Sequence, residues 1–431
     1  MKDCESVSSG LHHSFSRIHK YCIRRIFIII IAVICFAVLL LCLLILFQKN
    51  QRKDEFDHFQ KSHEIKTYFE KLVQAINESP NLKWKAKYNP FGIRSEKPDI
   101  MFNKISLNDK SNIINKKLID DIYKFHESNL MKQHIRKLSD FPASELPDEF
   151  DARRKWPLCP SIHNVPNQGG CGSCYAVAVA GVASDRICIA TNGTVQVILS
   201  SDDIISCCIS CGACTGGDSL KAMIYWVNEG IVTGGRDGCQ PYPYDIKCGI
   251  PCPLLEFAKN AKMQRCHHKC QNIYYRNDYF NDKHYASIAY TMLPRILSLT
   301  GNINIIVPAV MDYFNTKIIN NTKEFLSFHE TLEILKKELY LFGPMTMAFP
   351  VTEEFLHYEN GIYTPYPEND FTNRIIYWHV VRIIGWGYDN DRIFHWIAVN
   401  SYGRNWGEYG LFRIDISFLR QFGLEYEAAL I

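Results

Sequence analysis

Two cysteines separated by two residues follow a glycine-rich stretch and stand directly before an apolar run. The stretch reads Gln168-Gly169-Gly170-Cys171-Gly172-Ser173-Cys174-Tyr175, and residues 176–183 are small or apolar throughout. So continuous a run predicts a buried helix that begins near Cys174. The unpaired N–H groups and positive dipole end at a helix N-terminus favour an anion and lower a thiol pKa. Because a thiolate is a nucleophile, Cys174 is a candidate for covalent catalysis; the alternative is a pair of disulfide cysteines before a core helix.

A histidine and an asparagine far along the chain could serve this cysteine. Residues 380–384 and 393–399 have the apolar, β-branched character of two strands around a short turn. His379 begins the first predicted strand and Asn400 ends the second, so a hairpin would bring the two side chains together. The imidazole could then exchange a proton with the thiol while the asparagine holds its orientation. His395 is the rival histidine, and its place within a strand away from the motif favours a structural role.

Composition bounds the remaining function classes. The chain has 431 residues, 48 basic and 45 acidic side chains, and 47% hydrophobic residues. This length can hold more than one domain, and without a basic stripe no nucleic-acid partner is predicted. Of the 17 cysteines, thirteen lie between Cys159 and Cys270. Read alone, Cys207, Cys208, Cys211 and Cys214 could form a zinc site, but so many scattered cysteines favour disulfides in an oxidising compartment. No metal or cofactor is predicted.

A long apolar segment near the start of the chain indicates a membrane span. Residues 26–47 are 22 consecutive apolar positions without a charge, and a bilayer needs about 20. The segment is longer than the core of a signal peptide, and no small-residue cleavage site follows it. The sequence therefore predicts an uncleaved signal-anchor with a luminal catalytic domain, in the endolysosomal or secretory pathway or extracellular after processing. A cleaved signal peptide is the alternative.

The stretch around Cys174 resembles the active-site segment of papain-like cysteine proteases. Its flanks are most similar to cathepsin B, through Leu146-Pro147, residues 150–153 and residues 184–188. The resemblance implies an α+β, two-lobed fold with a helical lobe and a β-barrel lobe, here preceded by an N-terminal transmembrane helix and a pro-segment. The expected organisation is a cytosolic tail over 1–25, the anchor over 26–47, pro-segment and spacer over 48–145, and a peptidase domain over 146–431 with a probable insertion over 294–330.

The resemblance also implies roles for residues outside the Cys–His pair. Gln168 would help the Cys174 backbone N–H form an oxyanion hole. The backbone of Gly216 and Gly217 would pair with an extended peptide substrate, although an ordinary turn is the alternative. Trp406 would belong to the substrate site, and Glu427 would lie at the base of the pocket for the second residue before the scissile bond, where it would accept arginine. Proteins and peptides would be the substrates, and the chain's own pro-segment the inhibitor.

The family pattern further implies six disulfides, which spacing alone could not assign. They are Cys159–Cys188, Cys171–Cys214, Cys207–Cys266, Cys208–Cys211, Cys239–Cys270 and Cys248–Cys252. The segment 248–252 is short and has no histidine, whereas cathepsin B carries two adjacent histidines in a loop there, so endopeptidase activity is expected. His267 and His268 are interpreted as surface residues. Sequons at Asn77, Asn192 and Asn320 are candidate glycosylation sites.

Three aromatic residues depart from the family pattern without removing a catalytic group. Tyr175 and Tyr402 stand where tryptophan is usual, and Trp378 precedes His379 where a small or acidic residue is usual. Tyr402 could still shield the His–Asn hydrogen bond, and Trp378 could narrow the substrate range. The alternative function is a catalytically silent relative used for binding or adhesion.

Overall fold

The computed structural model describes residues 28, 30–36, 39–40, 64–90, 111–243, 265–298, 304–314, 318–319, 322–323, 327–367, 374–419 and 424–431. The chain divides into two compact units, Met1–Phe69 and Glu70–Ile431. In the first unit, the described residues are helical. Apart from the predicted membrane anchor, the features below belong to the second unit.

The predicted membrane anchor is not supported. Within the described part of the chain, no helix has both the length and the apolar character required to cross a bilayer. Of the predicted span 26–47, only residues 28, 30–36, 39 and 40 are described, and the predicted tail 1–25 lies outside the described residues. The finding contradicts the predicted anchor and the localisation that was inferred from it.

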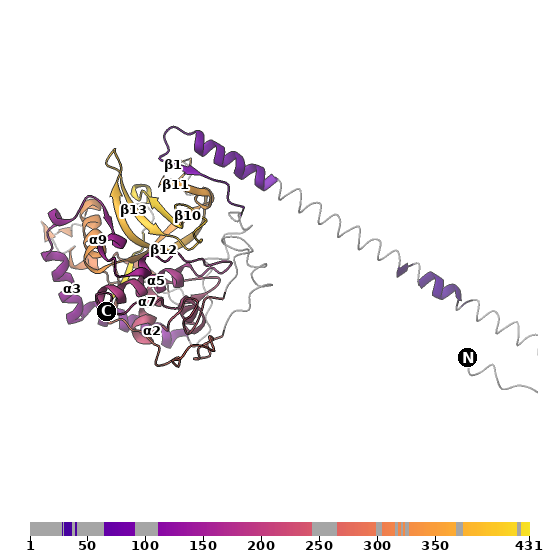
Figure 1. Ribbon diagram of the computed structural model, residues 1–431, viewed down its shortest axis with the longest axis horizontal. Coiled ribbons are helices and arrows are strands. Elements are labelled where there is room, and N and C mark those ends of the chain that lie inside the picture. The colour runs from indigo at the N-terminus through magenta and orange to yellow at the C-terminus, as the bar shows by residue number, and fades with distance from the viewer. Residues whose placement is uncertain are drawn as a thin grey trace, which may run out of the picture. The chain divides into compact units, whose positions relative to one another are not determined.

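A seven-stranded sheet forms one part of the second unit (Figure 1). Neighbouring strands are antiparallel except for the parallel pair β11–β14. The sheet order is β1 (Trp84–Ala86), β11 (Tyr358–Tyr363), β14 (Leu411–Ile414), β13 (Phe394–Val399), β12 (Ile375–Tyr388) and β10 (Met345–Thr352), with β2 (Phe150–Asp151) paired to β12. The central pair β12–β13 is the hairpin that the sequence predicted around His379 and Asn400.

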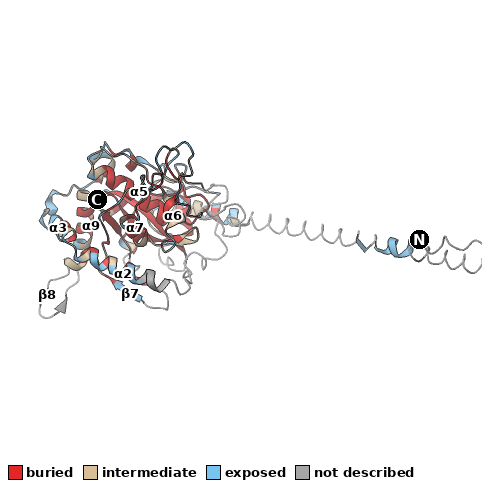
Figure 2. Ribbon diagram, turned by 90° about the horizontal axis from the view of Figure 1, so that it is seen from below, coloured by how far each residue is buried: buried red, intermediate tan, exposed pale blue. Residues whose placement is uncertain are grey.

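Helices form the other part, and Figure 1 shows α5 and α7 below the strands β10, β12 and β13. The helix α5 packs against β12 and is buried over most of its length, as Figure 2 shows in red. It begins at Cys174, as predicted from the apolar run. Segregated helices and sheet confirm the predicted α+β class. The helices are α2 (Ser111–Glu127), α3 (Asn129–Asp140), α4 (Ala152–Lys155), α5 (Cys174–Ala190), α6 (Ser201–Cys207), α7 (Ser219–Asn228) and α9 (Phe328–Phe342).

Short elements complete the second unit. The paired strands are β3 (Gly212–Ala213) with β4 (Gly216–Gly217), β5 (Ile288–Thr291) with β15 (Glu427–Leu430), β6 (Arg295–Ser298) with β7 (Asn304–Val307), and β8 (Ile318–Ile319) with β9 (Thr322–Lys323). The 3₁₀ turns are η3 (Ala143–Glu145), η4 (Pro160–His163), η5 (Val310–Tyr313), η6 (Glu353–His357) and η9 (Ser417–Leu419). The predicted insertion 294–330 thus contains the hairpins β6–β7 and β8–β9.

The helices α2 and α3, within the predicted pro-segment and spacer, are packed into the same core as the peptidase domain. Met131 and Leu138 of α3 are fully buried. His134 of α3 forms a buried ion pair with Glu338 of α9, with 2.8 Å between Nε2 and Oε2, and Arg186 of α5 binds the other oxygen of Glu338 at 2.8 Å. Burial would raise the pKa of Glu338, but the charges of His134 and Arg186 lower it to about 2. The helix α3 is therefore joined to α9, which is itself joined to α5 through Arg186.

Segment 70–90 attaches to the sheet through β1. Trp84 is buried between the rings of Tyr358 and Tyr363, with ring centroids 6.1 and 5.1 Å away. β1 pairs with β11 in the register Trp84↔Gly361. Asn77, a predicted glycosylation site, exchanges two hydrogen bonds between its side-chain amide and the backbone of Ala86. Asn192 is exposed, and Asn320 lies outside the described residues.

Five of the six disulfides that the resemblance implied are present. They are Cys159–Cys188, Cys171–Cys214, Cys207–Cys266, Cys208–Cys211 and Cys239–Cys270. The pair Cys248–Cys252 lies outside the described residues. Closing loops of 29 to 59 residues in this way limits the freedom of the unfolded chain, except at Cys208–Cys211, which spans three.

Candidate active site

A cavity of about 320 Å³ contains the predicted nucleophile. Cys174, His379 and Gln168 line it, although they come from α5, β12 and the loop before α5. Gly216 and Gly217 also line it. The sequence therefore identified residues that lie more than 200 positions apart along the chain and that the fold brings into one cavity.

Cys174 is the first residue of α5, where the helix has unpaired backbone N–H groups. Its side chain is half-buried. Among the described cysteines of the second unit, it alone has no disulfide partner, so its sulfur is available as a thiol or thiolate. The adjacent disulfide Cys171–Cys214 ties the approach to α5 to the loop that precedes β4.

His379 is oriented by Asn400. The ring Nε2 lies 2.8 Å from Asn400 Oδ1, and that oxygen also accepts the Ser401 backbone N–H at 2.7 Å. An oxygen that accepts from Ser401 is an acceptor for His379 as well, so Nε2 carries the proton. In the neutral ring, Nδ1 is then the nitrogen that can accept a proton. Asn400 follows β13 directly, and the β12–β13 pairing holds it beside His379.

Burial opposes charge on both members of the Cys–His pair. It raises the pKa of the Cys174 thiol to about 11, although backbone hydrogen bonds from Cys174, Tyr175 and Val380 act in the opposite direction. It lowers the pKa of His379 to about 4, although the bond to Asn400 opposes this. The predicted effect of the helix N-terminus is thus present but smaller than the effect of burial. Proton transfer from Cys174 to His379 would place opposite charges in one cavity, where each stabilises the other.

Gln168 is held in place on both ends of its side chain. Nε2 donates to the Cys171 carbonyl at 2.9 Å, and Oε1 accepts the Ser401 hydroxyl. Because an amide nitrogen has two hydrogens, one donor of Gln168 remains for another acceptor. Ser401, which follows Asn400, was not singled out from the sequence; its position next to a candidate catalytic residue was the only signal.

Gly217 lies at a place where no side chain fits. A Cβ at this position would come within 2.4 Å of the Tyr175 ring and 2.5 Å of the Cys211 carbonyl oxygen. Its neighbour Gly216 has a φ of 116° and is paired with Ala213 in the small β3–β4 sheet. The packing therefore requires glycine at position 217, and both glycines line the cavity.

Aromatic rings cover the His379 imidazole. Tyr402 stacks on it with ring centroids 5.0 Å apart, and the hydroxyls of Tyr402 and Tyr377 are hydrogen-bonded at 2.5 Å. Tyr377 and Trp378 line the cavity. Trp406, a predicted substrate-site residue, is buried behind Tyr402 and donates from Nε1 to the Leu356 carbonyl at 3.0 Å; it does not line this cavity.

The cavity wall also contains charged residues that the sequence did not identify. Arg295 and Glu425 line the cavity together with Asp218. Glu427, the predicted base of the pocket, is fully buried and does not line it. No sequence signal marked Arg295, which lies in the predicted insertion 294–330.

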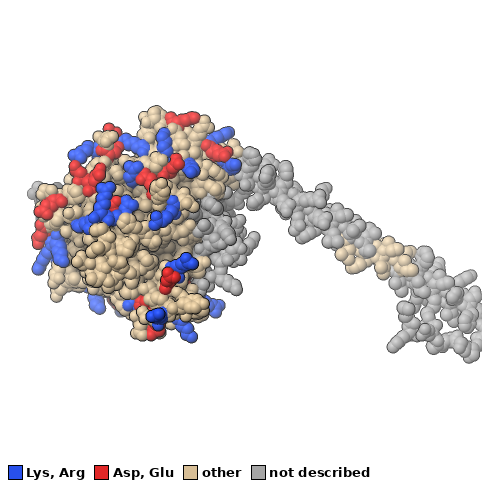
Figure 3. Space-filling model, viewed as in Figure 1, with Lys and Arg blue, Asp and Glu red and all other residues tan. Residues whose placement is uncertain are grey.

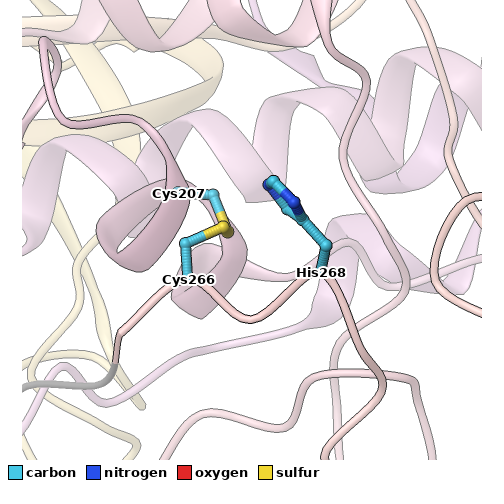
Figure 4. Close-up of side chains that lie close together, drawn as sticks. All are labelled: Cys207, Cys266 and His268. Atoms are coloured by element: carbon cyan, nitrogen blue, oxygen red, sulfur yellow. A yellow bond between two sulfur atoms is a disulfide. The ribbon is translucent and has the colours of Figure 1, made fainter.

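Other candidate residues lie apart from the cavity. Cys207, Cys266 and His268 are close enough together to suggest a metal site (Figure 4), but the two sulfurs form a disulfide and offer no thiolate ligand. His267 and His268 are exposed. His395 is buried within β13, next to Gly387 of β12. On the face in Figure 3, basic and acidic side chains are interspersed.

Comparison with known proteins adds a family assignment. The sequence pattern of the family described as "Papain family cysteine protease" matches residues 146–430. The chain is 36% identical over 298 residues to cathepsin B-like cysteine proteinase 6 of Caenorhabditis elegans, covering 66% of this chain and 65% of that protein. It is 32% identical over 363 residues to a cathepsin B-like cysteine proteinase of Schistosoma japonicum, covering 82% and 88%.

Solved structures show the same fold at lower identity. Procathepsin B S9 from Trypanosoma congolense has a TM-score of 0.51 and 21% identity, over 84% of this chain and 97% of that chain. Digestive procathepsin L2 from Tenebrio molitor has a TM-score of 0.50 and 17% identity, over 87% and 94%. The chain spans only 65% and 61% of the length of two Caenorhabditis elegans relatives, cathepsin B-like cysteine proteinases 6 and 3.

Proposed function

The chain belongs to the papain family of cysteine proteases, and from that premise we propose that it is a cathepsin-B-like endopeptidase that hydrolyses peptide bonds in proteins. One observation carries the proposal: Cys174 at the start of α5, the Asn400-bonded His379 and Gln168 all line a single cavity. A silent binding relative would not need this combination of nucleophile, base and donor.

The proposed reaction has two halves, the acylation of Cys174 by the substrate and the hydrolysis of the resulting thioester. His379 takes the thiol proton at Nδ1, because Nε2 is engaged with Asn400. The Cys174 thiolate attacks the substrate carbonyl, and the resulting oxyanion accepts hydrogen bonds from the Cys174 N–H and the Gln168 side chain. His379 gives its proton to the leaving amine as the C–N bond breaks. Water, deprotonated by His379, then hydrolyses the thioester and restores the thiol.

An endopeptidase is expected to cleave a peptide whether or not the peptide has a free C-terminal carboxylate. A quenched fluorescent peptide with an amidated C-terminus is expected to be cleaved internally as well as its free-acid form, because no residue is proposed to bind a C-terminal carboxylate. Mass spectrometry of the products measures both reactions. The proposal would be wrong in this respect if only C-terminal dipeptides were released, and if a His267→Ala, His268→Ala variant lost that release.

The proposal includes an inhibitory role for segment 70–90 as part of a pro-segment. Its support is the attachment of this segment to η6, the turn before β11. The Asn89 backbone N–H donates to His357 Nδ1 at 2.9 Å, the Asn89 side chain donates to the Leu356 carbonyl at 3.0 Å, and the Tyr88 ring stacks on His357. Lys87 N–H donates to the His357 carbonyl at 2.7 Å.

The contact with His357 predicts acid-weakened docking of this segment. Burial lowers the pKa of His357 to about 4 from an ordinary value of 6.5, and Nδ1 must be unprotonated to accept from Asn89. Above pH 6.5 the His357 side chain is neutral in both the docked and the released state, so docking is at full strength. As pH falls from 6.5 to 4, the released state gains a proton, and docking weakens by up to about tenfold per pH unit.

The docking of segment 70–90 is measured by hydrogen exchange of the β1 amides in a full-length chain inactivated by Cys174→Ala. The exchange rates are corrected for the intrinsic effect of pH. The control is His357→Asn, whose side-chain oxygen accepts a hydrogen bond but does not titrate. If both chains lost protection equally between pH 6.5 and 4, His357 would not be the cause.

A further inference from the structure

One arginine from the insertion gathers three carboxylates in the cavity wall. Arg295 is the first residue of β6, and its side chain is 9% exposed. Its Nη1 lies 2.8 Å from Glu427 Oε1, and its Nη2 lies 2.9 Å from Asp218 Oδ2 and 3.1 Å from Glu425 Oε2. The guanidinium thus occupies the point where these acids converge.

Glu427 is fully engaged within the protein. Besides Arg295, it accepts the hydroxyl groups of Ser219 and Thr346, each at 2.8 Å on Oε2. Its side chain is fully buried, and it does not line the cavity. A substrate cation could reach Glu427 only by displacing Arg295.

The hairpin β6–β7 holds Arg295 in this place. Leu297 of β6 and Val307 of β7 are buried, and Arg295 pairs with Val307 in the register of the hairpin. The guanidinium is also held electrostatically: burial would lower the pKa of Arg295, but the charges of Asp218, Glu427 and Glu425 raise it. Arg295 is therefore a charged, fixed part of the wall.

The charged residues of the cavity wall disfavour both cationic and anionic side chains of a substrate. A substrate arginine would meet Arg295 where the acids are already paired. A substrate carboxylate would become the fourth acid around one guanidinium. Glu425 is also paired with Arg295, at 3.1 Å, and burial raises the pKa of this carboxyl against the effect of Arg295, which weakens its attraction for a second cation. An uncharged side chain has neither cost.

We propose that Arg295 is the specificity-determining residue of this pocket, a built-in cation that takes the place of a substrate arginine and directs the enzyme to uncharged side chains at the second residue before the scissile bond. The inference rests on the proposed function and replaces the expectation that Glu427 accepts a substrate arginine.

The wild-type enzyme gives the first test. Fluorogenic dipeptides with arginine next to the scissile bond and phenylalanine, arginine or glutamate at the second position are compared by kcat/KM. The phenylalanine substrate is expected to exceed each charged substrate by more than about tenfold, as for an unpaired charge placed in a buried site. A ratio of phenylalanine to arginine below tenfold would overturn the proposal, and no variant needs to fold for this result.

The second test removes the cation. Arg295→Met keeps most of the side-chain volume and exposes the acids, so kcat/KM for the arginine substrate is expected to rise at least about tenfold relative to phenylalanine. Adding Glu427→Gln to Arg295→Met should reduce that gain. The matched control is Arg374→Met, since Arg374 also pairs with a buried glutamate, Glu354, but does not line this cavity. Thermal melting of each variant checks folding.

The outcomes separate this inference from the proposed function. No hydrolysis of the phenylalanine substrate, with no labelling of Cys174 by a thiol-directed epoxide, would refute the protease function and this inference together. Ready hydrolysis of both the phenylalanine and the arginine substrates would refute the role of Arg295 alone. A folded Arg295→Met variant with an unchanged ratio would do the same.

Discussion

Replacing Cys174 with alanine is expected to lower kcat/KM for peptide hydrolysis by at least about 10⁴-fold, because the reaction then has no nucleophile. His379→Ala should have an effect of similar size, since burial keeps the isolated thiol protonated and the His379 imidazole is the base proposed to take its proton. The double variant should be little worse than either single one, because the two residues act as a unit. Steady-state kinetics with one fluorogenic peptide measures all three.

His395→Gln is the matched control for His379. His395 is also a buried histidine of the same hairpin, one strand away, but it does not line the cavity. Its replacement should leave kcat/KM within a few-fold, provided that the melting temperature shows a folded protein. Loss of activity in a folded His395→Gln variant, with activity kept in His379→Ala, would reverse the assignment of the base.

The second large effect concerns Gln168. Gln168→Glu is expected to reduce kcat by about 10²–10³-fold with little change in KM, because it removes the amide donor proposed for the oxyanion while keeping the side-chain shape. In the structure, Gln168 is buried, fixed by Cys171 and Ser401, and has a second amide hydrogen to offer.

Gln240→Glu provides the comparison for this change. Gln240 is equally buried but lies outside the cavity that contains Cys174. Equal losses of kcat in both variants would indicate a general effect of burying a glutamate, and the oxyanion role of Gln168 would be rejected.

The sequence was sufficient for the parts of the site that local pattern determines. The apolar run after Cys174 predicted the start of α5, and the two strands around one turn predicted that His379 and Asn400 meet. Five disulfides came from family resemblance, since spacing cannot choose among the possible pairings.

What the sequence could not provide depends on contacts between distant segments. The partner of Glu427 is Arg295, which lies 132 positions earlier in the chain. No local pattern connects the two residues, so the pocket was expected to attract arginine. The ion pair of His134 with Glu338, which anchors α3, likewise joins segments that no local pattern connects. The helix terminus was predicted to lower the pKa of Cys174, whereas burial, a tertiary property, raises it.

The predicted anchor failed for a different reason. Hydropathy over 26–47 measures the sequence only, and within the described residues no helix has the required length and apolar character.

The most direct test of the account is the pH dependence of Cys174 alkylation in the active enzyme. Iodoacetamide labelling, located by mass spectrometry, is compared for the wild type and His379→Ala. If the imidazole takes the thiol proton, the wild type should be alkylated rapidly below about pH 6, whereas the variant should react only at alkaline pH, above the ordinary thiol pKa of about 8.5. Superimposable profiles for the two proteins would show that His379 does not ionise Cys174 and would contradict the central claim.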